Sequence, residues 1–231
     1  MKKIKFFFII FISIFITKTS FSAEAIKPMK VDWTFKGLTG KFDRASLQRG
    51  FQVYKEVCSS CHSMKYLSYR NLGQPGGPEF TEEEVKAIAA SFEITDGPDS
   101  QGEMFTRPGR PADKFLNPYP NDEAAKAANG GAYPPDMSVL VKARKGGANY
   151  IYSVLLGYEE KPESVILDEG VYYNKYMAGQ KIKMPKVLSD GLVEYADGTV
   201  SSEAQMAKDV TTFLAWAAEP ELEERHKTGV K

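Results

Sequence analysis

Apolar residues at helical spacing predict a long helix over residues 43–62. Five of these residues follow one another in steps of 4, 3, 4 and 3, which places on one helix face Leu47, Phe51, Tyr54, Cys58 and Cys61. We expect Asp43 or Ser46 to cap the helix. Gly50 lies inside it, at a cost near ~1 kcal/mol relative to alanine, so we expect another helix to cross closely there.

A second long helix is predicted near the other end of the chain. The capping box Ser202-x-x-Gln205 opens it, and we expect it to reach residue 217. Its apolar positions predict one buried face made of Met206, Val210, Phe213, Leu214 and Ala217.

Three shorter helices are expected between these two. A Thr81-x-x-Glu84 capping box predicts a helix over residues 81–92. Two more are predicted over 136–145 and 149–158, on either side of a pair of glycines.

The remaining segments have the composition of loops. Residues 71–78 are rich in glycine and proline, and residues 107–135 hold six prolines. A small hairpin is predicted over 193–200, with Asp197-Gly198 at its turn. The sequence therefore indicates a mainly α fold with long loop insertions and a small β-hairpin.

The N-terminus has the pattern of an export signal. A basic leader, an apolar run from Phe6 to Ile16 and small residues near Ser22 and Ala23 predict a signal peptide over residues 1–22. The apolar run is too short for a transmembrane anchor, which needs about 20 apolar residues. We expect a tether over 23–42, with Trp33, Phe35 and Leu38 packed on a domain over 43–220, and a charged tail over 221–231.

Export changes the charge of the chain. The full sequence has 30 basic and 30 acidic residues, and the predicted leader removes four lysines and no acid, which leaves a net charge of −4. Eight acids and one base lie between Glu79 and Glu103. This window fits a solvated surface, which we favour for most of its residues, or a docking surface for a basic protein.

The chemistry of the sequence is concentrated in Cys58-Ser59-Ser60-Cys61-His62, which holds both cysteines of the chain. A C-x-x-C-H run is typical of covalent haem attachment, with the histidine as an axial ligand of the iron. Zinc would need a fourth ligand, and the one other histidine, His226, lies in the charged tail. A thioredoxin-like pair lacks the expected βαβ pattern, whereas a plain disulfide stays an alternative. We expect a carbonyl of loop 71–78 to orient His62.

A second axial ligand decides what such an iron does. His226 is a poor candidate, and four methionines stay open: Met104, Met137, Met177 and Met184. We favour Met184, because Met-Pro in an irregular loop holds a side chain in place outside a helix core. Two axial protein ligands favour electron transfer. A vacant position would instead favour an enzyme that activates a small molecule, such as a peroxidase.

Several segments in order resemble the cytochrome c1 family, the haem subunit of the quinol:cytochrome c oxidoreductase (cytochrome bc1) complex. The resemblance covers nearly all of the chain after the leader. It rests on residues 49–64, Asp96-Gly-Pro98, 102–105, Arg107-Pro-Gly109, 129–132, Pro134-Pro-Asp136, Ala143-Arg144, Gly146-Gly147 and 208–220.

The resemblance implies a c-type cytochrome fold and a set of site residues. It makes Cys58 and Cys61 the thioether residues of one covalently bound haem c, and His62 and Met184 the axial ligands. Arg144 is then expected to meet a haem propionate. Three residues are expected close to the haem, namely Tyr150, Pro134 and Pro135.

The resemblance also implies partners and a location. It implies assembly with cytochrome b, electrons taken from a Rieske iron–sulfur protein and given to a c-type cytochrome, and no nucleic-acid partner. The expected location is the periplasmic face of a bacterial inner membrane. The resemblance further implies that the complex is the enzyme and that the chain alone is an electron carrier.

Two departures from the family pattern stand out. The family often has Met-Ala-Pro-Pro where this chain has Met184-Pro-Lys-Val187. The family also ends in a transmembrane anchor, and no apolar run follows Pro220 here. Either the anchor lies beyond the given sequence or partners hold the protein at the membrane.

Overall fold

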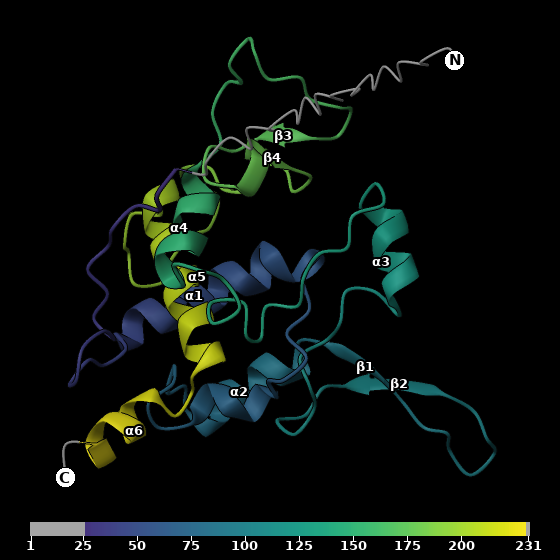
Figure 1. Cartoon of the computed structure of the whole chain (residues 1–231). Coiled ribbons are helices and arrows are strands. Elements are labelled where there is room, and N and C mark those ends of the chain that lie inside the picture. Colours follow the sequence, from purple (N-terminus) through teal and green to yellow (C-terminus); the bar gives the residue numbers. More distant parts are fainter. Residues whose placement is uncertain (1–25, 230–231) are drawn as a thin grey trace, which may run out of the picture.

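The computed structural model describes residues 26–229, which leaves the predicted leader outside the described part. Within it the chain is mainly helical, as expected (Figure 1). The α-helices are α1 (Arg44–Glu56), α2 (Glu82–Ala90), α3 (Asp122–Ala128), α4 (Ala148–Leu156), α5 (Glu203–Ala218) and α6 (Leu222–Gly229). The 3-10 helices are η1 (Cys58–Ser60), η2 (Tyr69–Gly73) and η3 (Ala178–Gln180). Two antiparallel pairs form the strands β1 (Glu93–Asp96) with β2 (Phe105–Pro108), and β3 (Tyr172–Tyr173) with β4 (Lys181–Ile182).

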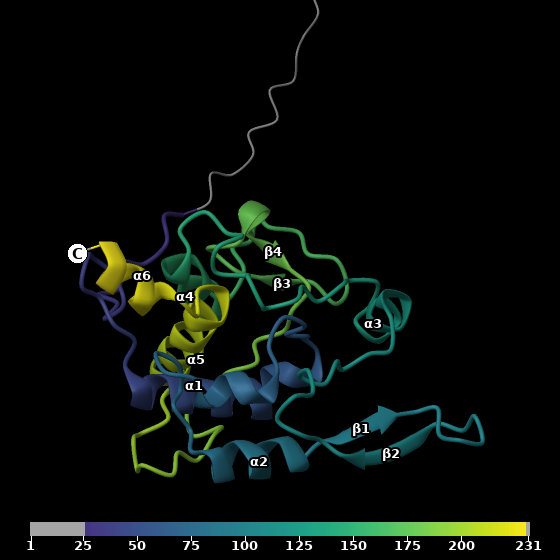
Figure 2. The ribbon, with the colours of Figure 1, turned by 90° about the horizontal axis from the view of Figure 1, so that it is seen from below.

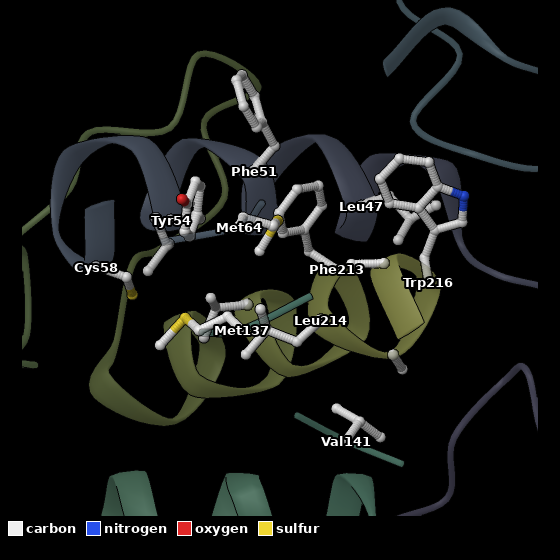
Figure 3. Close-up of a cluster of buried hydrophobic side chains, with 14 of the residues drawn as sticks. Leu47, Phe51, Tyr54, Cys58, Met64, Met137, Val141, Phe213, Leu214 and Trp216 are labelled. Atoms are coloured by element: carbon white, nitrogen blue, oxygen red, sulfur yellow. The ribbon is translucent and has the colours of Figure 1, made fainter. Parts of the chain in front are cut away.

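Helices α1 and α5 cross at the centre of the molecule, and their apolar side chains fill the space between them (Figure 3). The crossing is close at Gly50, as predicted: a Cβ there would lie 2.1 Å from the carbonyl oxygen of Asp209. The predicted buried face of α5 is also confirmed. Asp43 is the N-cap of α1, with its carboxylate accepting from the Ser46 amide at 2.7 Å, and Ser202 caps α5.

A buried ion pair fixes the same crossing. Asp209 on α5 is fully buried, and its carboxylate accepts from the Arg49 guanidinium at 2.8 and 3.1 Å. The Ser46 hydroxyl donates to it as well, and Arg49 also reaches Asp197 at 2.7 Å. Because a buried charge without its partner is costly, this pair fixes the two helices in one register.

Helix α4 packs against α5 and is covered by the segment that precedes α1. Residues 26–42 form no helix or strand, and Trp33 donates its indole N–H to the side chain of Asn149 at 2.7 Å. Trp33 and Phe35 are buried, whereas Leu38 is exposed, contrary to the expectation that it packs on the domain. At the other end, His226 on α6 lies 2.9 Å from the Gly40 carbonyl through Nδ1.

Two predicted elements are wrong. Residues 136–145 form consecutive turns and no helix, because Asp136 and Ser138 are held to the segment after His62 by hydrogen bonds. Residues 193–200 do not pair as a hairpin, since Val193 and Tyr195 are buried in the core while the carboxylate of Asp197 is engaged by Arg49.

Other elements differ in extent or were not expected. Helix α1 ends at Glu56, so the Cys58 and Cys61 segment is a 3-10 turn that follows the helix. Helices α3 and α6 and both strand pairs lie in segments where none was predicted. The capping box at Thr81 and Glu84 is present, and α4 matches the helix predicted over 149–158 except that it begins one residue earlier and ends two residues earlier.

The β1–β2 hairpin projects away from the body beside α2, as both views show (Figures 1 and 2). Its base is fixed by Arg107, which pairs with Asp96 on β1 and with Asp113 beyond β2. Among residues 26–229, no helix is both long enough and apolar enough to cross a bilayer.

Candidate functional site

The C-x-x-C-H segment forms a tight turn directly after α1. The amides of Cys61 and His62 both donate to the Cys58 carbonyl, at 3.1 and 2.9 Å. Cys58 is buried at the end of the central cluster (Figure 3), Cys61 is half-buried, and the two sulfurs are not joined by a disulfide. The turn therefore presents two thiols and an imidazole on a short stretch anchored to the core.

The orientation of the His62 ring is set by a backbone carbonyl. Its Nδ1 lies 2.8 Å from the carbonyl oxygen of Pro135. A carbonyl oxygen only accepts, so Nδ1 carries the proton and Nε2 keeps a free lone pair, the form that binds a metal. The orienting carbonyl was expected in loop 71–78. It comes instead from Pro135, which lies 73 residues after His62 in the sequence.

Asp136 fixes the Pro135 carbonyl in that place. Its carboxylate accepts from the Ser63 hydroxyl at 2.8 Å and from the backbone amides of Lys65 and Ser138, both at 2.9 Å. The Met137 amide donates to the Ser63 carbonyl at 2.8 Å. The chain directly after Pro135 is thus fastened to the chain directly after His62.

Burial shifts the pKa values of two side chains in this turn. It raises the pKa of the Cys58 thiol to about 12, so the thiol is protonated at neutral pH and is not a reactive redox thiolate. Burial lowers the pKa of His62, which favours the neutral imidazole that a metal requires. Both directions fit a ligand turn better than a thioredoxin-like pair.

A cavity of about 130 Å³ lies beside Cys61 and is lined by Pro134, Tyr119 and Tyr133 among others. The Tyr119 hydroxyl contacts the Cys61 sulfur at 3.8 Å and accepts from the Asn129 side chain at 3.1 Å. Pro134 and Pro135 are therefore both near the C-x-x-C-H turn.

Met184 lies in a second, smaller cluster next to α4. This cluster is built on Val154, Tyr176 and Ile182, with the half-buried Met184 packed against it. The neighbouring Lys183 donates its ammonium to the Gly130 carbonyl at 2.7 Å. That hydrogen bond ties the Met184 loop to the segment that continues to Pro134 and Pro135.

The three other methionines have different surroundings. Met104 is 60% exposed in the loop between β1 and β2. Met137 is buried in the central cluster (Figure 3). Met177 accepts at its sulfur from the Tyr150 hydroxyl at 3.3 Å. Tyr150 packs against the Met184 cluster and also against the central cluster that contains Cys58.

Arg144 is exposed at the end of the turns that precede α4, and its guanidinium donates to the Ala143 carbonyl at 3.2 Å. Among the described residues it has no acidic partner within ion-pair distance. The structure thus groups Cys58, Cys61, His62, Pro134 and Pro135 in one place, Tyr150 and Met184 in another, and leaves Arg144 on the surface.

This donor set fits a covalently held haem. Two thiols stand three positions apart, the next residue offers an unprotonated Nε2, and the loop of a half-buried methionine is tied to the segment that contacts the histidine. Sequence reasoning missed Asp136 as a support of His62, and it missed Tyr119 and Tyr158, which contact the cysteine turn and the Met184 loop. Only the Pro-Pro-Asp run gave a local signal, because the other contacts join distant segments.

Comparison with known proteins gives the family. The model of the Cytochrome C1 family matches residues 33–231. "Cytochrome c1-2, heme protein, mitochondrial" of Solanum tuberosum is 55% identical over 199 residues, which cover 86% of this chain and 75% of that protein. "Cytochrome b-c1 complex catalytic subunit, mitochondrial" of Candida albicans is 51% identical over 209 residues, covering 90% and 72%. "Cytochrome b/c1" of Bradyrhizobium diazoefficiens is 51% identical over 222 residues, which cover 88% of this chain but 32% of that protein.

Proposed function

Because the chain belongs to the cytochrome c1 family, we propose that it is the single-haem electron-transfer subunit of a cytochrome bc1 complex. The observation that carries the proposal is the His62 ring, which Pro135 holds with its Nε2 free, one residue after a pair of correctly spaced thiols. A relative named as a cytochrome b–c1 complex subunit supports the assignment to that complex.

The proposal assigns each site residue a role. Cys58 and Cys61 would hold one haem c through two thioether bonds, and His62 and Met184 would bind its iron. Pro134, Pro135 and Tyr150 would contact the haem, and Arg144 would bind a propionate. The exposed guanidinium of Arg144 supports this role, since it is free of an acidic partner among residues 26–229.

The bound haem iron would supply the chemistry, the gain and loss of one electron. The protein residues bind it, exclude water and set its potential, and none acts as acid, base or nucleophile. His62 would bind the iron through Nε2. The hydrogen bond from Nδ1–H to the Pro135 carbonyl makes Nε2 a stronger electron-pair donor. Transfer is then outer-sphere at a haem edge, and the enzyme is the quinol:cytochrome c oxidoreductase complex.

We propose the partners and location that follow from this role. The chain accepts electrons from the Rieske iron–sulfur protein and donates them to a c-type cytochrome. Cytochrome b is the third partner, and the name of the longer Bradyrhizobium relative supports it. The location proposed is the periplasmic face of the inner membrane, after loss of a signal peptide over residues 1–22.

The domain division proposed from the sequence has a tether over 23–42, a haem domain over 43–220 and a tail over 221–231. Two contacts join the tether and the tail to the haem domain. Trp33 of the tether bonds to Asn149 on α4, and Glu223 of the tail pairs with Arg44 at 2.7 Å. Both end segments are therefore packed onto the haem domain where the structure describes them.

The assignment of Met184 is tested by replacing it with leucine in the haem-loaded protein. We expect the methionine-to-iron absorption to disappear and the reduced protein to bind carbon monoxide, because one axial position is then open. Met177→Leu is the matched control, since it removes a sulfur from the same cluster. Carbon monoxide binding by the unmodified protein, or an unchanged spectrum in Met184→Leu, would contradict the proposal.

A further inference from the structure

The loop that carries Met184 has few backbone hydrogen bonds of its own. Within the described chain, no backbone-to-backbone hydrogen bond outside the strand pair involves residues 183–188. The loop is fixed on either side, by Ile182 on β4 and by Leu188, which is buried in the core. Side chains must therefore hold the stretch that contains Met184.

Tyr158 provides such a contact at Met184 itself. Its hydroxyl donates to the Met184 carbonyl at 2.9 Å, across 26 residues of sequence. Burial raises the pKa of Tyr158, so the hydroxyl keeps its proton and stays a donor. The ring packs in the same small apolar cluster as the methionine side chain.

The position of Tyr158 is in turn fixed by Asn174. Asn174 is fully buried, donates to the Val154 carbonyl at the end of α4 at 2.7 Å, and accepts from the Tyr176 amide at 3.1 Å. A β-bridge pairs Tyr158 with Asn174. Gly157 makes the approach feasible, since a Cβ there would lie 2.6 Å from the Asn174 side-chain oxygen.

We propose that Tyr158 is a positioning residue that keeps Met184 at the iron by holding its backbone carbonyl. This inference rests on the proposed function. Asn174 and Tyr158 have different roles. Asn174 joins the end of β3 to α4 and so supports the fold, whereas Tyr158 bonds to the carbonyl of the proposed ligand Met184. Loss of one neutral hydrogen bond shifts an equilibrium by roughly two- to ten-fold, so the methionine should be displaced that much more easily.

The test is Tyr158→Phe in the haem-loaded, oxidised protein, with imidazole as the displacing ligand. We expect a two- to ten-fold lower imidazole concentration at half-displacement of the methionine-to-iron absorption. The thermal unfolding midpoint by far-UV circular dichroism should change little, since the ring stays in its cluster. Tyr172→Phe is the control, because Tyr172 is exposed on the neighbouring strand and should leave both readings unchanged.

The outcomes separate this inference from the proposed function. If Met184→Leu abolishes the absorption but Tyr158→Phe titrates like the unmodified protein, the role of Tyr158 is refuted and the ligand assignment stands. If Met184→Leu keeps the absorption, the ligand assignment fails and the inference fails with it. A Tyr158→Phe protein that only melts earlier, with unchanged imidazole binding, shows a structural role and overturns the inference.

Discussion

At the scale of single residues, Asp136 connects the sequence motif to the geometry around His62. Its carboxylate holds two backbone amides and one hydroxyl, all within 2.9 Å. It follows Pro135 directly, so the carbonyl that orients the His62 ring cannot shift without straining these bonds. The Asp136 carboxylate thus holds in place the backbone that orients His62, a proposed iron ligand.

Replacing Asp136 with alanine should loosen this arrangement. We expect the free energy of unfolding to fall by about 1–3 kcal/mol, because buried donors lose their acceptor. The reduction potential of the haem-loaded protein should rise, since a weaker Nδ1–H bond makes His62 a poorer donor to the ferric iron. Chemical denaturation and a potentiometric titration measure the two effects.

The control for Asp136→Ala removes a charge without removing the hydrogen bonds. Asp122 lines the cavity beside Cys61 and is exposed, so Asp122→Ala changes the local charge alone. Equal shifts in potential for the two variants would mean that charge, and not the orientation of His62, sets the effect.

The residue scale also shows where sequence reasoning stops. Cys58, Cys61 and His62 are predicted as site residues because their spacing is local and specific. The carbonyl partner of His62 was misplaced, because the Pro135 contact joins segments 73 residues apart. No periodicity or motif in the sequence predicts a contact between segments so far apart.

At the scale of elements, the α1–α5 crossing follows from one glycine and one ion pair. Gly50 leaves room for the Asp209 backbone, and Arg49, one residue earlier, pairs with the Asp209 side chain. The close crossing at Gly50 could be predicted from the sequence, because a glycine inside a helix lowers its stability and so indicates a packing reason. It did not reveal which residue Arg49 would meet, since any of 30 acids was available.

Gly50→Ala should therefore push the two helices apart. The new methyl group would overlap the Asp209 carbonyl, and overpacking of a core typically costs about 1–3 kcal/mol. Gly229→Ala on α6 is the control, since no described atom lies within 4 Å of its Cβ position. Urea denaturation of the haem-loaded variants compares the two, and equal stability would contradict the close crossing.

The β1–β2 hairpin should respond to acid through Asp113. Its hydrogen bonds with the Arg107 guanidinium lower the pKa of the Asp113 carboxyl to about 2, below the value near 3.9 expected in the unfolded chain. The native state therefore gives up this proton more easily, so the pair stabilises the fold above about pH 4. That contribution is lost as the pH falls through about 2.

Asp113→Asn should remove this part of the pH dependence. We expect the free energy of unfolding of the unmodified protein to fall more steeply between pH 4 and pH 2 than that of the variant. Urea titrations followed by far-UV circular dichroism at several pH values measure it. Glu93→Gln, an acid on the same hairpin without an ion-pair partner among the described residues, should keep the original slope.

Helix prediction failed at residues 136–145 for a physical reason. The apolar residues Met137, Leu140 and Val141 are buried, but the start of this segment is bonded to the chain after His62: the Met137 amide donates to the Ser63 carbonyl, and the Ser138 hydroxyl accepts from the Tyr66 amide. Tertiary hydrogen bonds therefore outweigh local helix preference there. The helices predicted over 81–92 and 149–158 are present as α2 and α4.

At the scale of the whole molecule, three of the eight acids in the window between Glu79 and Glu103 form ion pairs within the fold. Glu79 pairs with Arg44, Glu82 with Lys86, and Asp96 with Arg107. Its composition was visible in the sequence, but its partners were not, because they come from α1, α2 and β2. We continue to favour a solvated surface for most of these acids.

For the whole exported chain, we propose that one haem is held covalently by Cys58 and Cys61. The most direct measurement is the intact mass of the mature protein purified from its host under denaturing conditions. We expect the polypeptide mass plus that of one haem, and the polypeptide mass alone when both cysteines are replaced by alanine. An exported, unmodified chain that carries no added haem would contradict it.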